Sequence, residues 1–167
     1  AWINNKLDGN LANIRVCGEY FKRCFTGLGI PPDKVTYRWA SDHASSIDYW
    51  EKVIRIAKSN TTKRIRRALP IMGREMETED IETAAMFYPC MQAADIFQLD
   101  LDIAGAGIEQ RKAHVIARET AQKLGRKTPI SLHTHLLPNL RGESQYRTGA
   151  GAAGRFDANR KIDSEIG

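Results

Sequence analysis

One stretch of the 167-residue sequence, between residues 99 and 132, limits the fold more than any other. Leucine or isoleucine alternates with aspartate over 99–103, which is the two-residue period of a strand. Gly105-Ala106-Gly107 predicts a turn, helical spacing over 113–124 predicts a helix that ends at Gly125, and 130–132 predicts a second strand. Strands joined through a helix lie parallel, with a right-handed crossover. The sequence therefore predicts an α/β fold with a parallel sheet.

Three helices and one short strand are predicted before this unit. Apolar residues have helical spacing over 11–28, 47–57 and 80–98, and an alternating pattern over 35–39 predicts the strand. Pro89 predicts a kink in the third helix, because proline removes a backbone donor and clashes with the preceding turn. The second helix has a serine N-cap and an expected buried stripe, which are Ser45 or Ser46 and Ile47, Trp50, Val53, Ile54 and Ala57.

The composition excludes several classes of protein. No apolar run approaches the ~18–20 residues of a membrane span, and the first residues contain no secretory signal. Cys17, Cys24 and Cys90 have neither metal-site nor disulfide spacing, so we expect free thiols in a reducing, cytoplasmic compartment. The first residue is Ala1 rather than Met, which we interpret as the sign of a processed chain or of a piece of a longer one.

The net charge of +5 is concentrated in one basic run, residues 52–74, which contains no acidic residue up to Arg74. Such a run is either a solvated surface or a contact for a phosphate backbone, and the pattern alone leaves both open. Its members are Lys52, Arg55, Lys58, Lys63, Arg64, Arg66, Arg67 and Arg74.

A phenol, an amide and a carboxylate share one face of the third predicted helix. Tyr88, Gln92 and Asp95 have the spacing i, i+4 and i+7, which brings them within about 60° of one another around a helix. Either they are polar groups that face solvent, or they form a site for a small ligand with an amine and a hydroxyl.

A second candidate lies at the carboxyl end of the first strand of the predicted unit, where ligands bind in parallel sheets. Gly105 and Gly107 resemble half of a dinucleotide fingerprint, but Gln110 occupies the place of its third glycine. The pattern indicates either a tight turn or backbone that a nucleotide can approach, with Glu109 beside ribose hydroxyls. Asp102 is expected at the same end.

The histidines give a weaker pattern. His133 and His135 point to the same side of a strand and could share a metal, but no third ligand is apparent, so we predict no metal site. His43 and His114 have no obvious partners in the sequence.

Residues 87–119 resemble one family, the tyrosyl-tRNA synthetases of archaeal and eukaryotic type. The resemblance rests on Y-P-x-x-Q-x-x-D from Tyr88 to Asp95, followed at a fixed distance by G-x-E-Q-R-K-x-H from Gly107 to His114. The opening residues 1–6 and the basic run are also similar to that family, and the likeness covers roughly residues 1–140. Asp95 favours this family over the neighbouring tryptophanyl family, because the indole of tryptophan does not require a carboxylate at this position.

The resemblance implies a Rossmann-type class I catalytic domain with a helical insertion, here the second half of the parallel sheet. Such an enzyme joins L-tyrosine to ATP, which enters with Mg²⁺, and transfers the tyrosyl group to tRNA(Tyr); it is typically a homodimer. The resemblance implies that tyrosine is bound by Tyr88, Gln92, Asp95 and Gln110. It implies that ATP is bound by Gly105, Gly107 and Glu109, and that tRNA is bound by Arg66, Arg67 and Arg111.

The two ATP-handling signatures of the class are absent from the sequence. The HIGH-like motif is expected before residue 1 and the KMSKS-like loop after about residue 140. We therefore expect a partial catalytic domain over 1–140, with the insertion at about 45–98 and a flexible Gly/Ala-rich tail over 141–167, and we predict that this chain alone does not activate tyrosine. Two alternatives remain, a non-catalytic synthetase-like module that binds tRNA or another RNA and a generic nucleotide-binding domain.

Overall fold

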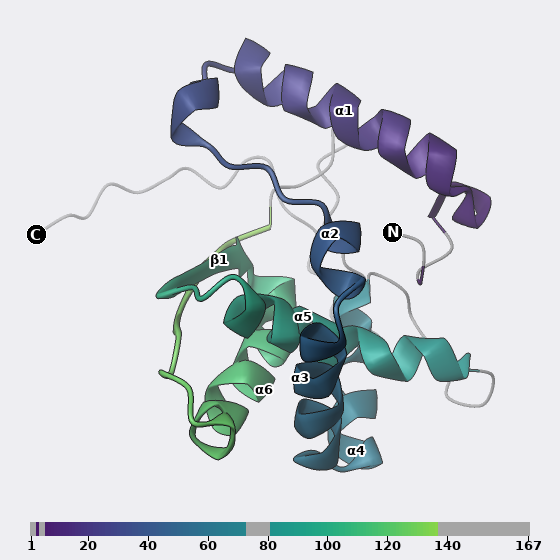
Figure 1. Ribbon diagram of the computed structural model, residues 1–167, viewed down its shortest axis with the longest axis vertical. Helices are drawn as coiled ribbons and strands as arrows, with labels where there is room; N and C mark the ends of the chain where they lie inside the picture. Colours follow the sequence, from purple (N-terminus) through teal and green to yellow (C-terminus); the bar gives the residue numbers. More distant parts are fainter. Residues whose placement is uncertain (1–2, 4–5, 73–80, 137–167) are drawn as a thin grey trace, which may run out of the picture.

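The computed structural model describes residues 3, 6–72 and 81–136 (Figure 1). The chain is mostly helical, and its two strands form one small sheet. The helices are α1 (Leu11–Gly27), α2 (Ala40–Ala44), α3 (Ile47–Lys58), α4 (Thr62–Arg66), α5 (Tyr88–Gln98) and α6 (Arg111–Ala121), and the strands are β1 (Ile103–Gly107) and β2 (Ile130–Thr134). Short 3₁₀ turns lie between them, at Lys6–Gly9, Pro32–Lys34, Leu69–Met72, Thr83–Phe87, Ile108–Gln110 and Gln122–Leu124.

The predicted strand, helix and strand unit is confirmed. Strands β1 and β2 pair in parallel, with Ile103 opposite Ile130 and Gly107 opposite Thr134, and α6 connects them. Helix α6 ends as predicted, because Gly125 takes up a left-handed conformation (φ 64°) after the last helical turn.

The predicted position of the first strand is wrong. Residues 99–102 end α5 and turn the chain, with the N–H of Leu99 donating to the carbonyl of Asp95 and Asp100 at φ 50°. The strand begins at Ile103 and includes Gly105-Ala106-Gly107, which the sequence analysis predicted to be a turn. The alternation of leucine and aspartate therefore belongs to the end of α5 and the turn that follows it. The strand itself consists of Ile103 and four small residues.

The strand predicted over 35–39 is also absent. Its backbone is extended at Val35 and Trp39, but no other strand pairs with it among the residues that the structure describes. It packs instead against α1, where the Lys22 ammonium lies 4.9 Å from the centre of the Trp39 ring. A Cβ atom on Gly18 would come within 2.2 Å of the same ring, so a larger residue here would displace the Trp39 side chain.

Helix α3 begins as predicted but buries a different face. The Ser46 side chain accepts a hydrogen bond from the N–H of Tyr49, which caps the helix. The buried face consists of Tyr49, Val53 and Ile56, so only Val53 of the predicted stripe is fully buried. The other large side chains of that stripe, Ile47, Trp50 and Ile54, are exposed.

Pro89 does not kink a long helix. It lies in the first turn of α5, where the missing N–H has no intrahelical partner to lose, and the separate 3₁₀ turn Thr83–Phe87 precedes it. The proline therefore marks a helix start, and the residue at the other end of the predicted helix, Asp80, lies outside the described residues.

Helices α3, α5 and α6 enclose the main core, and their buried side chains pack into one cluster (Figure 1). Helix α1 has no buried residue, and it lies apart from these helices in Figure 1. None of the helices in the described part of the chain has the length and apolarity that crossing a bilayer requires.

Candidate functional site

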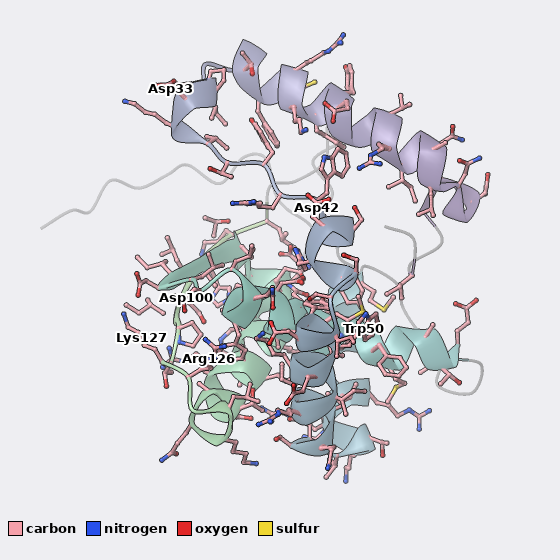
Figure 2. The ribbon with its side chains drawn as sticks, viewed as in Figure 1. Asp33, Asp42, Trp50, Asp100, Arg126 and Lys127 are labelled. Carbon is pink, nitrogen blue, oxygen red and sulfur yellow. The ribbon has the colours of Figure 1, made fainter. Side chains whose placement is uncertain are left out.

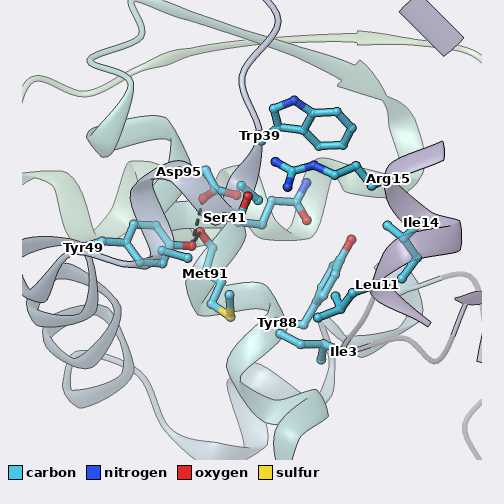
Figure 3. Close-up of a pocket in the computed structure, with 13 residues that line it drawn as sticks. Ile3, Leu11, Ile14, Arg15, Trp39, Ser41, Tyr49, Tyr88, Met91 and Asp95 are labelled. Carbon is cyan, nitrogen blue, oxygen red and sulfur yellow. Dashed lines mark hydrogen bonds between the residues drawn. The ribbon is translucent and has the colours of Figure 1, made fainter. Parts of the chain in front are cut away.

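A pocket of about 490 Å³ lies between α1, the segment through α2 and the inner face of α5 (Figure 3). The predicted trio Tyr88, Gln92 and Asp95 lines it from α5. The remaining lining side chains are mostly apolar, which suits a small ligand held by a few polar groups. They come from Ile3, Leu11, Ile14, Arg15, Trp39, Ala40, Ser41, Ala44, Tyr49 and Met91.

Two side chains that the sequence analysis missed hold Asp95. The Tyr49 hydroxyl donates a hydrogen bond of 2.8 Å to Asp95 Oδ1, as Figure 3 shows, and His43 Nε2 lies 3.0 Å from the same oxygen. Both partners are more than 40 residues away along the chain, at separations of 46 and 52. His43, which has no obvious partner in the sequence, therefore has one in the fold. Spacing within one helix carries no signal for contacts of this range.

The phenols of the pocket stay protonated. Burial and the neighbouring Asp95 carboxylate raise the pKa of Tyr49 and of Tyr88 above the usual range of a phenol. The Tyr49 hydroxyl is therefore a hydrogen-bond donor at any physiological pH. It donates to Asp95, with the carbonyl of Met91 farther away at 3.3 Å.

Gln92 and Gln110 connect α5 to the turn after β1. Gln110 Oε1 accepts a hydrogen bond of 2.9 Å from Gln92 Nε2, and Gln110 Nε2 donates to the carbonyl of Ile71 at 3.0 Å. The Gln92 Oε1 atom is buried without a partner among the described residues. A buried acceptor without a donor is costly, and an ammonium group of a ligand would satisfy it.

Gly107 and Glu109 lie against each other at the carboxyl end of β1. A Cβ atom on Gly107 would come within 2.2 Å of the Glu109 carboxylate, so glycine is required for this approach, whereas nothing lies within 4 Å of such an atom on Gly105. Glu109 Oε2 is buried without a partner among the described residues. It is a second acceptor for which a ligand hydroxyl would be a suitable donor.

Asp102 does not belong to this site. It precedes β1 at the opposite end of the strand and pairs with Lys127, which lies close to Asp100 at the same edge of the molecule (Figure 2). The prediction that placed Asp102 at the carboxyl end is wrong, because the strand begins four residues later than expected.

The basic run contains more counter-charges than its sequence indicates. Lys52 pairs with Asp48, Arg55 with Glu51 at 2.6 Å, and Arg64 with Glu119 of α6 at 2.5 Å. These partners lie one turn earlier on the helix or on another helix. An acid-free run in the sequence is therefore not free of counter-charges in the fold, and Arg74 lies outside the described residues.

A shallow basic cleft of about 190 Å³ lies where α4 meets the start of α6. The structure brings Arg67 and Arg111 together there, from segments far apart in the sequence, whereas Arg66 does not line it. Four basic side chains contribute, and they are Arg64, Arg67, Arg111 and Lys112. Such a cleft suits an anion such as a phosphate group.

His133 faces another histidine, His114. Its ring centre lies 5.0 Å from that of His114 on α6, whereas His135 is exposed beyond the end of β2. Burial, and then the neighbouring His133, lower the pKa of His114. No group of three metal-binding side chains occurs among the residues that the structure describes.

The sequence also matches a family model. The model of the class I tRNA synthetases (W and Y) matches residues 2–147, which is most of the chain. The chain therefore belongs to the class I tRNA synthetases of this family.

The relatives within this family are tyrosine–tRNA ligases of archaeal type. The chain is 43% identical over 151 residues to the enzyme of Aeropyrum pernix, covering 90% of this chain and 42% of the relative. It is 46% identical over 142 residues to that of Sulfurisphaera tokodaii, covering 85% of this chain and 39% of the relative. The chain thus spans about two fifths of the length of these relatives.

Solved structures agree with this placement. The crystal structure of tyrosyl-tRNA synthetase from Aeropyrum pernix superposes with a TM-score of 0.78 at 39% identity, over 90% of this chain and 44% of that one. The enzyme from Pyrococcus horikoshii, crystallised with L-tyrosine, superposes with a TM-score of 0.75 at 42% identity, over 82% of this chain and 40% of that one. The predicted class I fold is confirmed for the part of the domain that the chain covers.

Proposed function

We propose that this chain is part of a tyrosine–tRNA ligase, the part that recognises L-tyrosine and contributes one side of the ATP site. The observation that carries the proposal is the position of Asp95, a carboxylate fixed by two donors and lining a largely apolar pocket. L-Phenylalanine would leave this carboxylate without the phenolic donor, and a site built for a hydroxyl rejects the analogue without it by about 10⁴–10⁵.

The other end of the amino acid would meet α5 and the turn after β1. Tyr88, Gln92 and Gln110 would hold the α-amino group, and the buried, unpartnered Gln92 Oε1 supports this assignment. Gly105 leaves the backbone open to ATP, and Gly107 lets the Glu109 carboxylate approach the end of β1, where the unpartnered Glu109 Oε2 would accept hydrogen bonds from ribose. Mg²⁺ would enter with the phosphates.

The chemistry requires positioning more than a reactive side chain. The tyrosine carboxylate attacks the α-phosphate of ATP and displaces pyrophosphate, so no nucleophile of the protein takes part. Binding the two substrates in line, with charge stabilisation at the phosphate, would supply the rate enhancement. The residues described here would bind and orient the substrates.

The basic cleft supports a contact with the acceptor end of tRNA(Tyr). Arg67 and Arg111 would meet its phosphates there, and Arg66 would lie beside the cleft. The same cleft also favours the second candidate function, a non-catalytic synthetase-like module that binds tRNA or another RNA. The two functions differ in one respect, since only the first requires tyrosine binding.

A homodimer is proposed through the outer face of α3. Ile47, Trp50 and Ile54 lie three or four residues apart and are exposed, with 87% of Ile47 accessible. Replacing Ile47 and Ile54 with Glu should shift the chain to monomers in sedimentation velocity. The matched control Val16→Glu on α1 should leave the distribution unchanged, and the proposal is wrong if both variants sediment like the unaltered chain.

Equilibrium dialysis tests the proposed function. The 167-residue chain should bind L-tyrosine saturably and should not bind L-phenylalanine or L-tryptophan at the same concentration. ATP–pyrophosphate exchange by the same chain should be undetectable, because the segments expected to carry the HIGH-like and KMSKS-like signatures are absent from its sequence. RNA binding without tyrosine binding would favour the second candidate, and measurable exchange would overturn the prediction of inactivity.

A further inference from the structure

His43 occupies a position that no step of the proposed reaction uses. It lies in the five-residue helix α2, which leads into α3. Only 13% of its side chain is accessible, and its ring lies 5.1 Å from the Tyr49 ring at an angle of 54°. Its polar contact is with Asp95, at 3.0 Å. The side chain is therefore held by packing and directed at one carboxylate.

The two donors to Asp95 converge on a single oxygen. Tyr49 reaches Oδ1 from α3 and His43 reaches the same atom from α2, whereas the described residues supply no donor to Oδ2. The Asp95 side chain lines the pocket and is 37% accessible. A carboxylate has about four lone-pair sites, so the second oxygen remains available for the hydroxyl of a ligand.

The chemistry fixes which nitrogen of His43 carries hydrogen. An ionised carboxylate only accepts hydrogen bonds, so Nε2 must carry the hydrogen that points at Oδ1. The torsion that orients a carboxylate is broad when nothing restrains it. With only the Tyr49 donor, the plane of the Asp95 carboxylate would be free to tilt, and Oδ2 would lose its alignment with the pocket.

We propose that His43 is a positioning residue for Asp95, and that its Nε2–H raises selectivity for a phenolic amino acid over the analogue without the hydroxyl. The inference rests on the proposed function, because it requires tyrosine to be the ligand of this pocket. It predicts that His43 affects L-tyrosine and L-phenylalanine unequally, since only tyrosine uses the aligned oxygen.

Two substitutions distinguish the contribution of the His43 N–H group to tyrosine affinity from the contribution of its ring. His43→Phe keeps a ring against Tyr49 but removes the donor, and His43→Gln keeps a side-chain N–H of similar reach. Calorimetric titration should give a tyrosine affinity about ten- to a hundredfold weaker for His43→Phe, the range for a hydrogen bond to a charged group. His43→Gln should recover most of this loss. His135→Phe, an exposed position outside the pocket, is the control and should bind like the unaltered chain.

The weak binding of L-phenylalanine, measured by competition, should be equal for the unaltered chain and both variants at His43. Equal losses for the two amino acids would assign His43 a packing role and overturn the proposal. If the unaltered chain binds tyrosine and His43→Phe binds it equally well, the inference alone fails. If the unaltered chain binds no tyrosine, the proposed function fails, and the inference fails with it.

A second measurement does not depend on the folding of a variant at His43. Nitrogen-15 NMR of the unaltered chain should detect the hydrogen of His43 on Nε2 and a shift of that signal when L-tyrosine is added. A His43 ring with its hydrogen on Nδ1, or a signal that tyrosine leaves unchanged, would overturn the proposal.

Discussion

The Asp95 pocket and the basic cleft present polar groups to a ligand in opposite ways. In the pocket, a few side chains are partly buried, hydrogen-bonded to one another and fixed by three helices. In the cleft, several cations gather on an open surface, and Arg64 is already paired with Glu119. A buried, directed group gives a large and salt-insensitive effect, whereas exposed charges give small effects that salt screens. The pocket can therefore select a ligand, whereas the cleft can only attract one.

The largest effect is expected from Asp95→Asn. The substitution preserves the shape of the side chain but removes its charge and turns one acceptor oxygen into an N–H donor, so the two protein donors and the phenol no longer have a separate oxygen each. Tyrosine affinity should fall by about a hundredfold, as for the loss of a hydrogen bond to a charged group. Equilibrium dialysis at low and high salt should give the same loss. Asp102→Asn, at the exposed end of β1, is the control, and equal binding by both variants would contradict the account.

A smaller and salt-dependent effect is expected in the cleft. Replacing Arg67 and Arg111 with Ala should weaken binding of an RNA acceptor stem and reduce the slope of log affinity against log salt by about one for each lost phosphate contact. Filter binding over a salt series measures both quantities. Arg55→Ala, whose guanidinium pairs with Glu51 on α3, should leave the slope unchanged. A loss that does not vary with salt would mean that these arginines act by packing.

Acid stability distinguishes the buried His114 from the exposed His135. His114 on α6 has a lowered pKa, whereas in the unfolded chain its pKa is near 6.5. Above pH 6.5 both states are neutral at this group. As the pH falls below 6.5, the unfolded chain takes up the proton first, so the free energy of unfolding declines until the folded pKa is passed.

Urea unfolding between pH 7.5 and 5 measures this decline. His114→Gln should flatten it on the acid side, whereas the control His135→Gln should not, because His135 is exposed. An identical decline in the His114 variant would assign the acid sensitivity to other groups.

The smallest effects are expected at the helix caps of the two sites. Ser46 caps α3, which presents Tyr49 to the pocket, and Thr61 caps α4, which precedes the cleft residue Arg67. Each change to Ala should cost about 1 kcal/mol or less in urea unfolding. Only Ser46→Ala should also lower tyrosine affinity, because only α3 positions a pocket residue. An equal loss of tyrosine binding in Thr61→Ala would contradict this division.

The sequence predicts what neighbouring residues determine. The helices over 11–28 and 113–124, the Gly125 end and the parallel pair of strands follow from local spacing, and α5 brings Tyr88, Gln92 and Asp95 into one pocket. Local pattern fails where a helix end has the period of a strand, as at 99–102. It also fails for 35–39, where an extended segment packs on α1 instead of pairing.

The rest of the candidate site depends on contacts between distant parts of the chain. Asp95 meets His43 and Tyr49, and Arg64 meets Glu119 at a separation of 55 residues. No periodicity carries that information. The buried face of α3 shows the same limit, since only packing against α5 decides that Tyr49 points inward while Trp50 stays exposed.

A crystal structure of the 167-residue chain with L-tyrosine tests the central claim most directly, because it locates the phenol relative to Asp95. The phenolic oxygen should lie about 2.7 Å from Asp95 Oδ2, within the range of a hydrogen bond between a hydroxyl and a carboxylate. The amino group should face Tyr88 and Gln92. Tyrosine bound with its ring turned away from Asp95, or outside this pocket, would contradict the account.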